Sequence, residues 1–267
     1  MKKCAVLLMV LFSGKLYAQE LFVFTEPASN MATKSVGLRL NNYFNKYNVS
    51  GYSNYYLIPE IMWGVSRKVM VHGDLFFSKS SRNFSTEGGS IYAKYRFLSN
   101  DEVHTHFRMA AYGRMSYNNS PVRQPAINFY GYNSGYETGV IATQLINKVA
   151  LSATSSFLHA FDNGKEKFLP GQNRNAINYS LSIGKLMLPK EYTSYRQTNV
   201  NLMLEFLGQT NLASGASYLD MAPAIQFIFD SRVRVDLSYL YTVVNKLQRT
   251  ATSGIFVRLE YNFFNVY

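Results

Sequence analysis

The chain has 267 residues, with 27 lysines and arginines against 16 aspartates and glutamates, 19 phenylalanines, 21 tyrosines and one cysteine. Only 16% of the residues are charged, whereas soluble domains average about 25%. Few charges, many aromatic residues and an excess of base exclude a disordered or acidic protein, and the length is enough for one large β domain or two ordinary ones.

Residues 1–18 have the pattern of a secretory signal peptide. Lys2 and Lys3 precede the apolar run AVLLMVLF, and Ala18 stands before the expected cleavage point. The apolar run is well short of the roughly 20 residues that a membrane-spanning helix needs. The sequence therefore predicts export of the mature chain.

Cleavage removes three of the 27 basic residues and the only cysteine, Cys4, so the net charge of +11 becomes +8. An exported chain without thiols cannot use disulfides for stability. Residues 19–33 show no strand pattern, and we expect them to form an N-terminal segment in the periplasm. Residues 34–267 are then expected to form a single β-barrel domain.

From residue 34 onward, apolar and polar residues alternate with period two. In the segment 232–241 (RVRVDLSYLY), Val233, Val235 and Leu237 share one face, while Arg234 and Asp236 share the other. Such a pattern is typical of a strand with one face toward lipid and the other toward water. The strand centres are expected near residues 40, 60, 73, 93, 110, 141, 155, 182, 204, 224, 237 and 259. We therefore predict a transmembrane antiparallel up-and-down β-barrel of about 12 strands, with roughly 10 to 14 as the range.

Short and long connections alternate along the chain. Tight turns are predicted at 66–68, 99–101, 147–148 and 230–231, and longer polar loops at 46–54, 78–89, 117–134, 162–175, 209–217 and 245–252. The connection 188–198 is longer than this rule predicts. The alternation is typical of an outer-membrane barrel with turns in the periplasm and loops outside.

A soluble β-sandwich or lipocalin-like barrel would also alternate, but its polar face would be crowded with Lys, Glu and Asp. Here many polar positions hold Ser, Asn, Gln or Tyr. Aromatic residues near strand ends suit the interfacial girdles of a membrane barrel. These residues are Tyr55, Trp63, Phe77, Phe97, Phe229 and Tyr241.

The C-terminal strand carries a second indication. Leu259, Tyr261, Phe263 and the terminal Tyr267 occupy alternate positions counted back from the C-terminus, with Asn265 as the exception. This strand resembles the recognition signal of bacterial outer-membrane β-barrel proteins, and the resemblance to that class covers nearly the whole mature chain. It implies insertion by the outer-membrane assembly machinery and a place in the outer membrane of a Gram-negative bacterium.

A narrower resemblance lies in the stretch YYLIPEIMWGVSRKVMVHGD, residues 55–74. It is similar to a hairpin in transporter-like barrels encoded near phenol-degradation (MetA-pathway) operons and in uncharacterised barrels of Bacteroidota. The resemblance implies a transporter-like barrel. It supplies no catalytic or binding residue that matches position by position.

If the apolar strand faces meet lipid, the opposite faces line the lumen. Seven positive and six negative residues are then expected inside: Arg39, Lys94, Arg96, Arg108, Arg114, Arg234 and Arg258, with Glu60, Asp74, Glu205, Asp220, Asp236 and Glu260. Ion pairs among them could fill the barrel. Alternatively, opposed charges could line a narrow polar path that orients a small solute. Twelve strands do not decide between a filled barrel and an open one.

The outer loops are expected to be basic. They contain Lys46, Lys79, Arg82, Arg123, Lys165, Lys167, Arg174, Lys246 and Arg249 against Glu87, Glu137, Asp162 and Glu166. Anionic lipopolysaccharide and outer-membrane lipids are the expected partners through electrostatic attraction, with an anionic solute as the alternative. A nucleic-acid partner is not expected.

Candidate catalytic and metal-binding groups are few. His104 and His106 share a strand face, but Arg108 continues that row and would oppose a metal ion. His72 and Asp74 also share a face, as lumen lining rather than a catalytic dyad. Loop 130–136 (YGYNSGY) could stack sugars or aromatic rings on its tyrosines, although such loops are also common as plain surface loops.

A membrane-embedded hydrolase would need a nucleophile, a base and an orienting acid. Ser155, Ser156 and His159 lie close in sequence, but no GxSxG motif and no suitably placed acid accompany them. No enzyme activity, catalytic residue, metal site or cofactor is expected. The leading expectation is passive or facilitated passage of a small solute through a narrow polar lumen. The alternatives are a closed structural or surface-interaction barrel that binds lipopolysaccharide or a partner through basic loops and, third, a membrane-embedded hydrolase.

Overall fold

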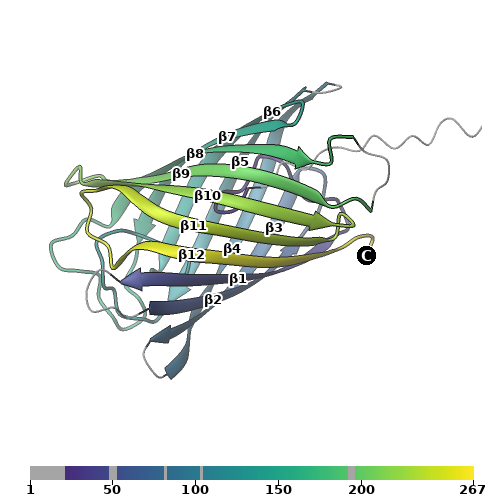
Figure 1. The fold of residues 1–267 in the computed structure, drawn as a ribbon. Helices are drawn as coiled ribbons and strands as arrows, with labels where there is room; N and C mark the ends of the chain where they lie inside the picture. The colour runs from purple at the N-terminus through teal and green to yellow at the C-terminus, as the bar shows by residue number, and fades with distance from the viewer. Residues whose placement is uncertain (1–21, 48–52, 81–82, 103–104, 192–195) are drawn as a thin grey trace, which may run out of the picture.

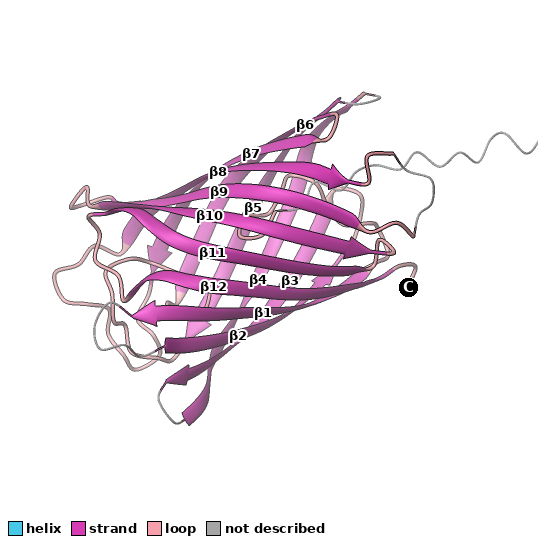
Figure 2. Cartoon of the chain, in the orientation of Figure 1, coloured by secondary structure: helices cyan, strands magenta, loops and turns pink. Residues whose placement is uncertain are grey.

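The computed structural model describes residues 22–47, 53–80, 83–102, 105–191 and 196–267. The predicted signal peptide with Cys4, together with Arg82 and His104, lies outside the described residues. Twelve antiparallel strands form one closed barrel (Figures 1 and 2). The strands are β1 Val36–Tyr47, β2 Ser53–Trp63, β3 Val69–Ser80, β4 Asn83–Asp101, β5 Thr105–Asn118, β6 Gly135–Ile146, β7 Val149–Ala160, β8 Asn175–Leu188, β9 Asn199–Asn211, β10 Ser217–Phe229, β11 Val233–Asn245 and β12 Ala251–Phe263.

Each strand pairs with its neighbours in sequence, and β1 closes the barrel on β12, from Val36 opposite Phe263 to Tyr47 opposite Ala251. Every predicted strand centre falls within one of these strands, so the predicted twelve-stranded barrel is confirmed. Closure removes the open sheet edges that would leave backbone groups unsatisfied in lipid. In the described part of the chain, no helix is long and apolar enough to span a bilayer.

The short connections gather at the end of the barrel where the C-terminus lies (Figure 1). Asp230 and Ser231 join β10 to β11 with φ angles of 49° and 56°, the two positive values that a type I′ hairpin turn requires. Two predicted connections are corrected. Most of 78–89 belongs to β3 and β4, and residues 99–101 end β4 rather than form a turn.

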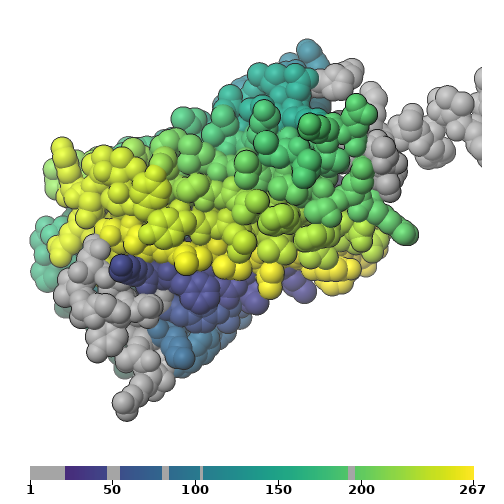
Figure 3. Space-filling view, in the orientation of Figure 1, coloured from purple at the N-terminus to yellow at the C-terminus, as the bar shows by residue number. Residues whose placement is uncertain are grey.

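The outer wall is apolar. Ile91 is 66% exposed, Met115 60% and Leu75 55%, and Figure 3 shows one continuous wall across the strands nearest the viewer. A soluble monomer rarely exposes so much contiguous apolar surface, because its contact with water is unfavourable. A lipid environment accounts for this surface.

Two segments outside the strands enter the barrel. Residues 22–31, called the N-terminal plug below, pack Phe22 and Val23 against Leu145, Met203 and Phe256. Residues 119–134, the connection between β5 and β6 and called the inner loop below, pack Ile127 and Phe129 against the inner side of β7 and β8. Within the predicted N-terminal segment 19–33, residues 22–33 are described, and Phe22 and Val23 are buried against the inner strand faces.

Candidate functional site

The structure places the predicted lumen residues on the inner strand faces, except Arg96. The inward residues are each at most 8% exposed: Arg39, Glu60, Asp74, Lys94, Arg108, Arg114, Glu205, Asp220, Arg234, Asp236, Arg258 and Glu260. Arg96 lies at the turn end of β4, where its Nη2 donates to the carbonyl of Arg67 over 2.8 Å. Its position next to a register shift at the strand end accounts for this.

Near the turn end, the charges form a dense lattice around Arg39. Its Nε lies 2.6 Å from Glu260 and its Nη1 2.6 Å from Glu26, with Glu60 at 3.4 Å. Arg234 extends the lattice to Glu260 at 3.4 Å. These pairs share buried carboxylates, and breaking one would leave a charge without compensation.

Other ion pairs connect β5 with β3 and lie within β11. Arg114 lies 2.7 Å from Asp74, and Arg234 lies 2.7 Å from Asp236. Arg258 donates to the Asn41 side chain over 2.7 Å. Most of the predicted lumen charges therefore compensate one another.

Glu205 holds the N-terminal plug. Its carboxylate accepts hydrogen bonds from the backbone N–H groups of Val23 (2.7 Å), Phe24 (2.9 Å) and Thr25 (3.0 Å) and from the Thr25 hydroxyl (2.8 Å). Glu205 is fully buried. Several convergent donors can satisfy a buried carboxylate without a cation. Here the plug supplies four of them, and the Ser182 hydroxyl of β8 supplies a fifth at 3.2 Å.

The plug in turn satisfies buried cations of the wall. Lys94 donates to the carbonyls of Pro27 (2.6 Å) and Ser29 (2.8 Å), and Arg234 donates to the carbonyl of Phe22 (2.6 Å). Sequence reasoning missed this arrangement because the plug has no strand or helix periodicity. The charges gave no signal either, because without Arg96 the expected lumen set holds six positive and six negative residues.

The inner loop is fastened to the opposite wall. The Gln209 side chain donates to the carbonyl of Ile127 (2.7 Å) and accepts from its N–H (2.9 Å). Ser116 donates to the carbonyl of Asn133 (3.0 Å), and Gln124 accepts from the Thr250 hydroxyl (2.9 Å). The loop is thus held inside by side-chain contacts rather than by strand pairing.

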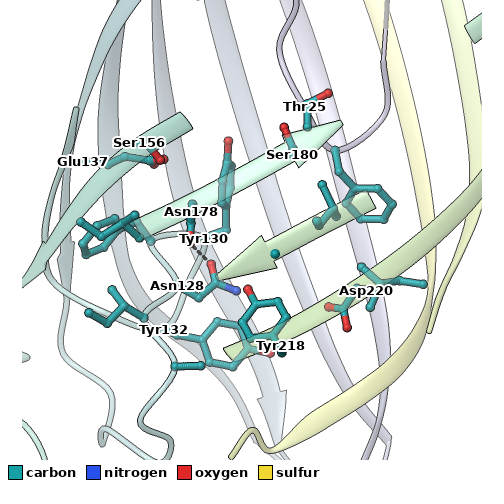
Figure 4. A pocket seen from close by; sticks show the side chains of 18 of the residues that line it. Thr25, Asn128, Tyr130, Tyr132, Glu137, Ser156, Asn178, Ser180, Tyr218 and Asp220 are labelled. Atoms are coloured by element: carbon teal, nitrogen blue, oxygen red, sulfur yellow. Dashed lines mark hydrogen bonds between the residues drawn. The ribbon is translucent and has the colours of Figure 1, made fainter. Parts of the chain in front are cut away.

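A cavity of about 280 Å³ lies in the lumen against both inserts, and Figure 4 shows part of its lining. The plug contributes Phe24, Thr25 and Glu26 to its wall, and the inner loop contributes Tyr130 and Tyr132. Aromatic side chains from the strands complete it: Tyr43, Tyr56, Tyr92, Tyr112, Tyr218 and Phe256. A volume of this size fits a small organic molecule, and the lining combines ring faces with polar groups.

A second cavity of about 260 Å³ adjoins the first and shares Tyr56, Gln124, Tyr132 and Thr250 with it. Its remaining lining is mainly polar, including Glu87. The rings of Tyr56 and Tyr132 contact at 4.8 Å between centroids. These two tyrosines form part of the boundary between the two cavities.

Two acidic residues expected in the outer loops lie inside the barrel instead. Glu137 is on β6 and accepts hydrogen bonds from Tyr112 (2.7 Å) and Ser156 (2.6 Å). Glu87 is the extra residue of a bulge in β4, because Phe76 pairs with Gly88 while Phe77 pairs with Thr86. Glu87 was expected in the polar loop 78–89, but β4 already begins at Asn83, and the Glu87 side chain at the bulge is buried.

Arg249 was expected in an exposed loop, but its side chain points into the barrel. Its guanidinium makes two hydrogen bonds to Asp220, at 2.5 and 2.6 Å. It also lies over the ring of Tyr218, at 3.7 Å from the centroid. The basic loop set therefore loses one exposed charge to the lumen.

The hydrolase candidates do not meet. Ser156 is buried and donates to Glu137, whereas His159 lies three positions further along β7, on the outer face. The His159 ring contacts Tyr136 at 5.5 Å and Phe161 at 5.5 Å between centroids. A serine and a histidine on opposite faces of a strand cannot share a proton in catalysis.

His72 and Asp74 both face inward, but with different partners. His72 Nδ1 lies 2.5 Å from Glu60, and Asp74 pairs with Arg114. Glu26, Glu60 and His72 come close enough to share a metal ion. Arg39 already pairs with both of these carboxylates, so a divalent cation would be opposed there by a fixed positive charge.

No protein-family model matches the chain, and no curated protein matches it. Among solved structures, an outer-membrane channel from Pseudomonas putida F1 superposes with a TM-score of 0.60 at 10% identity, over 91% of this chain and 100% of that one. A KdgM porin superposes with a TM-score of 0.51 at 8% identity, over 86% of this chain and 99% of that one. This chain therefore has the fold of outer-membrane channel barrels, and with its apolar outer wall it is an outer-membrane β-barrel.

Proposed function

We propose that this barrel mediates passive or facilitated passage of a small solute across the outer membrane. The cavity of about 280 Å³ within the closed barrel carries the proposal. A barrel that served only as a scaffold would gain stability by filling this space with side chains, because packed interiors leave few voids. The likeness of the fold to channel barrels supports the same proposal, as does the resemblance of the hairpin 55–74 to transporter-like barrels.

Passage requires the N-terminal plug to move. Lys94, Arg234 and Glu205 bind the plug through its backbone groups, and these bonds lie outside the strand pairing that holds the barrel. A segment held in this way can open locally at a cost below that of global unfolding. The inner loop is bound in a similar manner, so the two inserts are the two gates of the proposed path.

We further propose that the exposed loop residues Lys165 and Lys167 contact lipopolysaccharide, and that the C-terminal strand guides assembly. Both lysines are exposed in the connection between β7 and β8. Exchange of both lysines for serine is expected to weaken binding to lipopolysaccharide vesicles at low salt. Equal binding by both proteins would remove these lysines from the contact.

Conductance of the purified protein in planar bilayers tests the proposed passage. Samples whose gel migration changes on boiling are folded barrels and are the only ones to use. We expect small, discrete current steps, because the inserts narrow the lumen. Folded protein that gives no current steps and no solute uptake into liposomes would contradict the proposal.

A further inference from the structure

The cavity contains one carboxylate that the ion pairs of the lumen do not neutralise. Among the charged residues that line it, Glu26 pairs with Arg39 (2.6 Å), Arg114 with Asp74 (2.7 Å), and Asp220 with Arg249 (2.5 Å). Glu137 makes no ion pair with any described residue, although it is only 8% exposed. Glu137 is therefore the charged residue in the described cavity wall that no cation contacts directly.

The strand register makes the missing ion pair of Glu137 significant. Glu137 on β6 stands directly opposite Arg114 on β5, a position from which an arginine would ordinarily pair with it. Arg114 instead donates to Asp74, to Ser90 (2.7 Å) and to the hydroxyl of Tyr130 (2.7 Å). The nearest cation is thus engaged elsewhere.

Neutral hydroxyls hold Glu137 in place. Tyr112 donates over 2.7 Å and Ser156 over 2.6 Å, both to the same oxygen, Oε1. Gly139 makes room for this arrangement, because a Cβ there would lie 2.8 Å from the Tyr112 ring and 2.6 Å from Ser156. Figure 4 shows Glu137 and Ser156 side by side at the cavity. Burial of a carboxylate that only two hydroxyls contact is energetically unfavourable unless a positive group also binds it.

The rest of the lining suits a cation and not an anion. Tyrosine rings attract positive groups to their faces, and the chain already uses this property: Arg114 lies 4.1 Å from the Tyr130 centroid and Arg249 3.7 Å from that of Tyr218. Both arginines are neutralised by their own carboxylates. An anionic solute would find no uncommitted positive group among the described residues of the wall.

We propose that the cavity binds a small organic cation, an ammonium group on an apolar or aromatic body, with the ammonium group at Glu137. The apolar part would lie against the tyrosine rings, and the ammonium would supply the positive charge that the carboxylate lacks. This inference rests on the proposed function in one respect: it takes the cation to be the solute that passes through the barrel.

Calorimetric titration of the detergent-solubilised full-length mature protein tests the site. The probes are 2-phenylethylamine, 2-phenylethanol and phenylacetate, which share a ring and differ in charge. We expect the amine to bind at least about tenfold more tightly than either other probe, as an ion pair and a cation–π contact in a desolvated site would give. Equal affinities for the three probes, or tighter binding of phenylacetate, would overturn the proposal.

Glu137→Gln isolates the charge, because the amide oxygen can still accept from Tyr112 and Ser156. The variant should lose the preference, so that the amine binds no more tightly than the alcohol. Glu87→Gln is the matched control, since Glu87 is a buried carboxylate of the second cavity, and it should leave amine affinity unchanged. An unchanged preference in Glu137→Gln would refute the assignment. If that variant does not fold, the comparison of probes on the wild-type barrel still decides.

The same samples in planar bilayers separate the two proposals. Amine binding without any conductance would contradict the proposed passage and support the cation site. Conductance together with equal affinities for the three probes would support passage and overturn the cation site.

Discussion

The two halves of the lumen use polar groups differently. Toward the turn end, the lattice around Arg39 and the plug on Glu205 compensate buried charges with carboxylates and backbone groups. In the cavity, aromatic rings predominate and Glu137 has only neutral hydroxyl partners. The comparison indicates that most lumen charges stabilise the barrel and its plug, whereas the proposed solute recognition would depend on a few groups in the cavity.

The largest expected effect follows from breaking the lattice. Arg39→Ala would leave Glu26 and Glu260 buried without their nearest cation, at a cost of about 3–5 kcal/mol in the free energy of unfolding. Urea unfolding in detergent, followed by heat-modifiable migration, measures the change. The exposed Lys165→Ala is the control and should change stability by less than about 0.5 kcal/mol. Similar small losses in both variants would show that the lattice does not stabilise the barrel.

A smaller effect, confined to the plug, is expected from Glu205→Ala. The plug would lose the acceptor for three backbone N–H groups, which can bind water once the plug opens, so we expect a net cost of about 1.5–3 kcal/mol. Because residues 19–267 contain no cysteine, maleimide labelling of Ala28→Cys in a protein of these residues reports plug opening. We expect labelling at least about tenfold faster in the Glu205→Ala background. Equal labelling rates would mean that Glu205 does not retain the plug.

The smallest of the three effects is expected from Gln209→Ala, which leaves the Ile127 N–H and carbonyl without partners at a cost of about 1–3 kcal/mol. Ala126→Cys, at a position only 2% exposed, reports opening of the inner loop. Labelling at Ala126→Cys should rise, while labelling at Ala28→Cys stays unchanged. A rise at both positions would show that the two inserts open together and would remove the distinction between the halves.

The strands were predictable because a barrel repeats one rule. Alternation with period two gave all twelve strands and the inward positions of residues such as Arg234 and Asp236, since neighbouring side chains on a strand point to opposite faces. Glu87 was expected in the polar loop 78–89, whereas the structure includes it in β4 as the extra residue of a bulge. Glu137 was expected in an outer loop because YNSGY (132–136) before it is typical of a loop, whereas Gly135 and Tyr136 already belong to β6.

The plug and the inner loop could not be predicted from local sequence. The plug is bound by Glu205, about 180 residues away along the chain, and nothing in residues 22–31 indicates that partner. The inner loop depends on Gln209 in the same way. Such segments are placed by tertiary contacts and not by intrinsic preference, so their entry into the lumen, and with it the cavity, becomes evident only in the folded barrel.

The most direct test of the gated path is to lock the plug. The Thr25 and Ser182 hydroxyl oxygens lie 2.9 Å apart, on the plug and on β8, so Thr25→Cys with Ser182→Cys should form a reversible disulfide in a chain without other thiols. Single-channel conductance is then measured before and after reduction, with each single variant as control. We expect the oxidised double variant to conduct at least about tenfold less than the reduced one, because the plug must move for passage. Equal conductance in the two states would contradict a path through the lumen that the N-terminal plug gates.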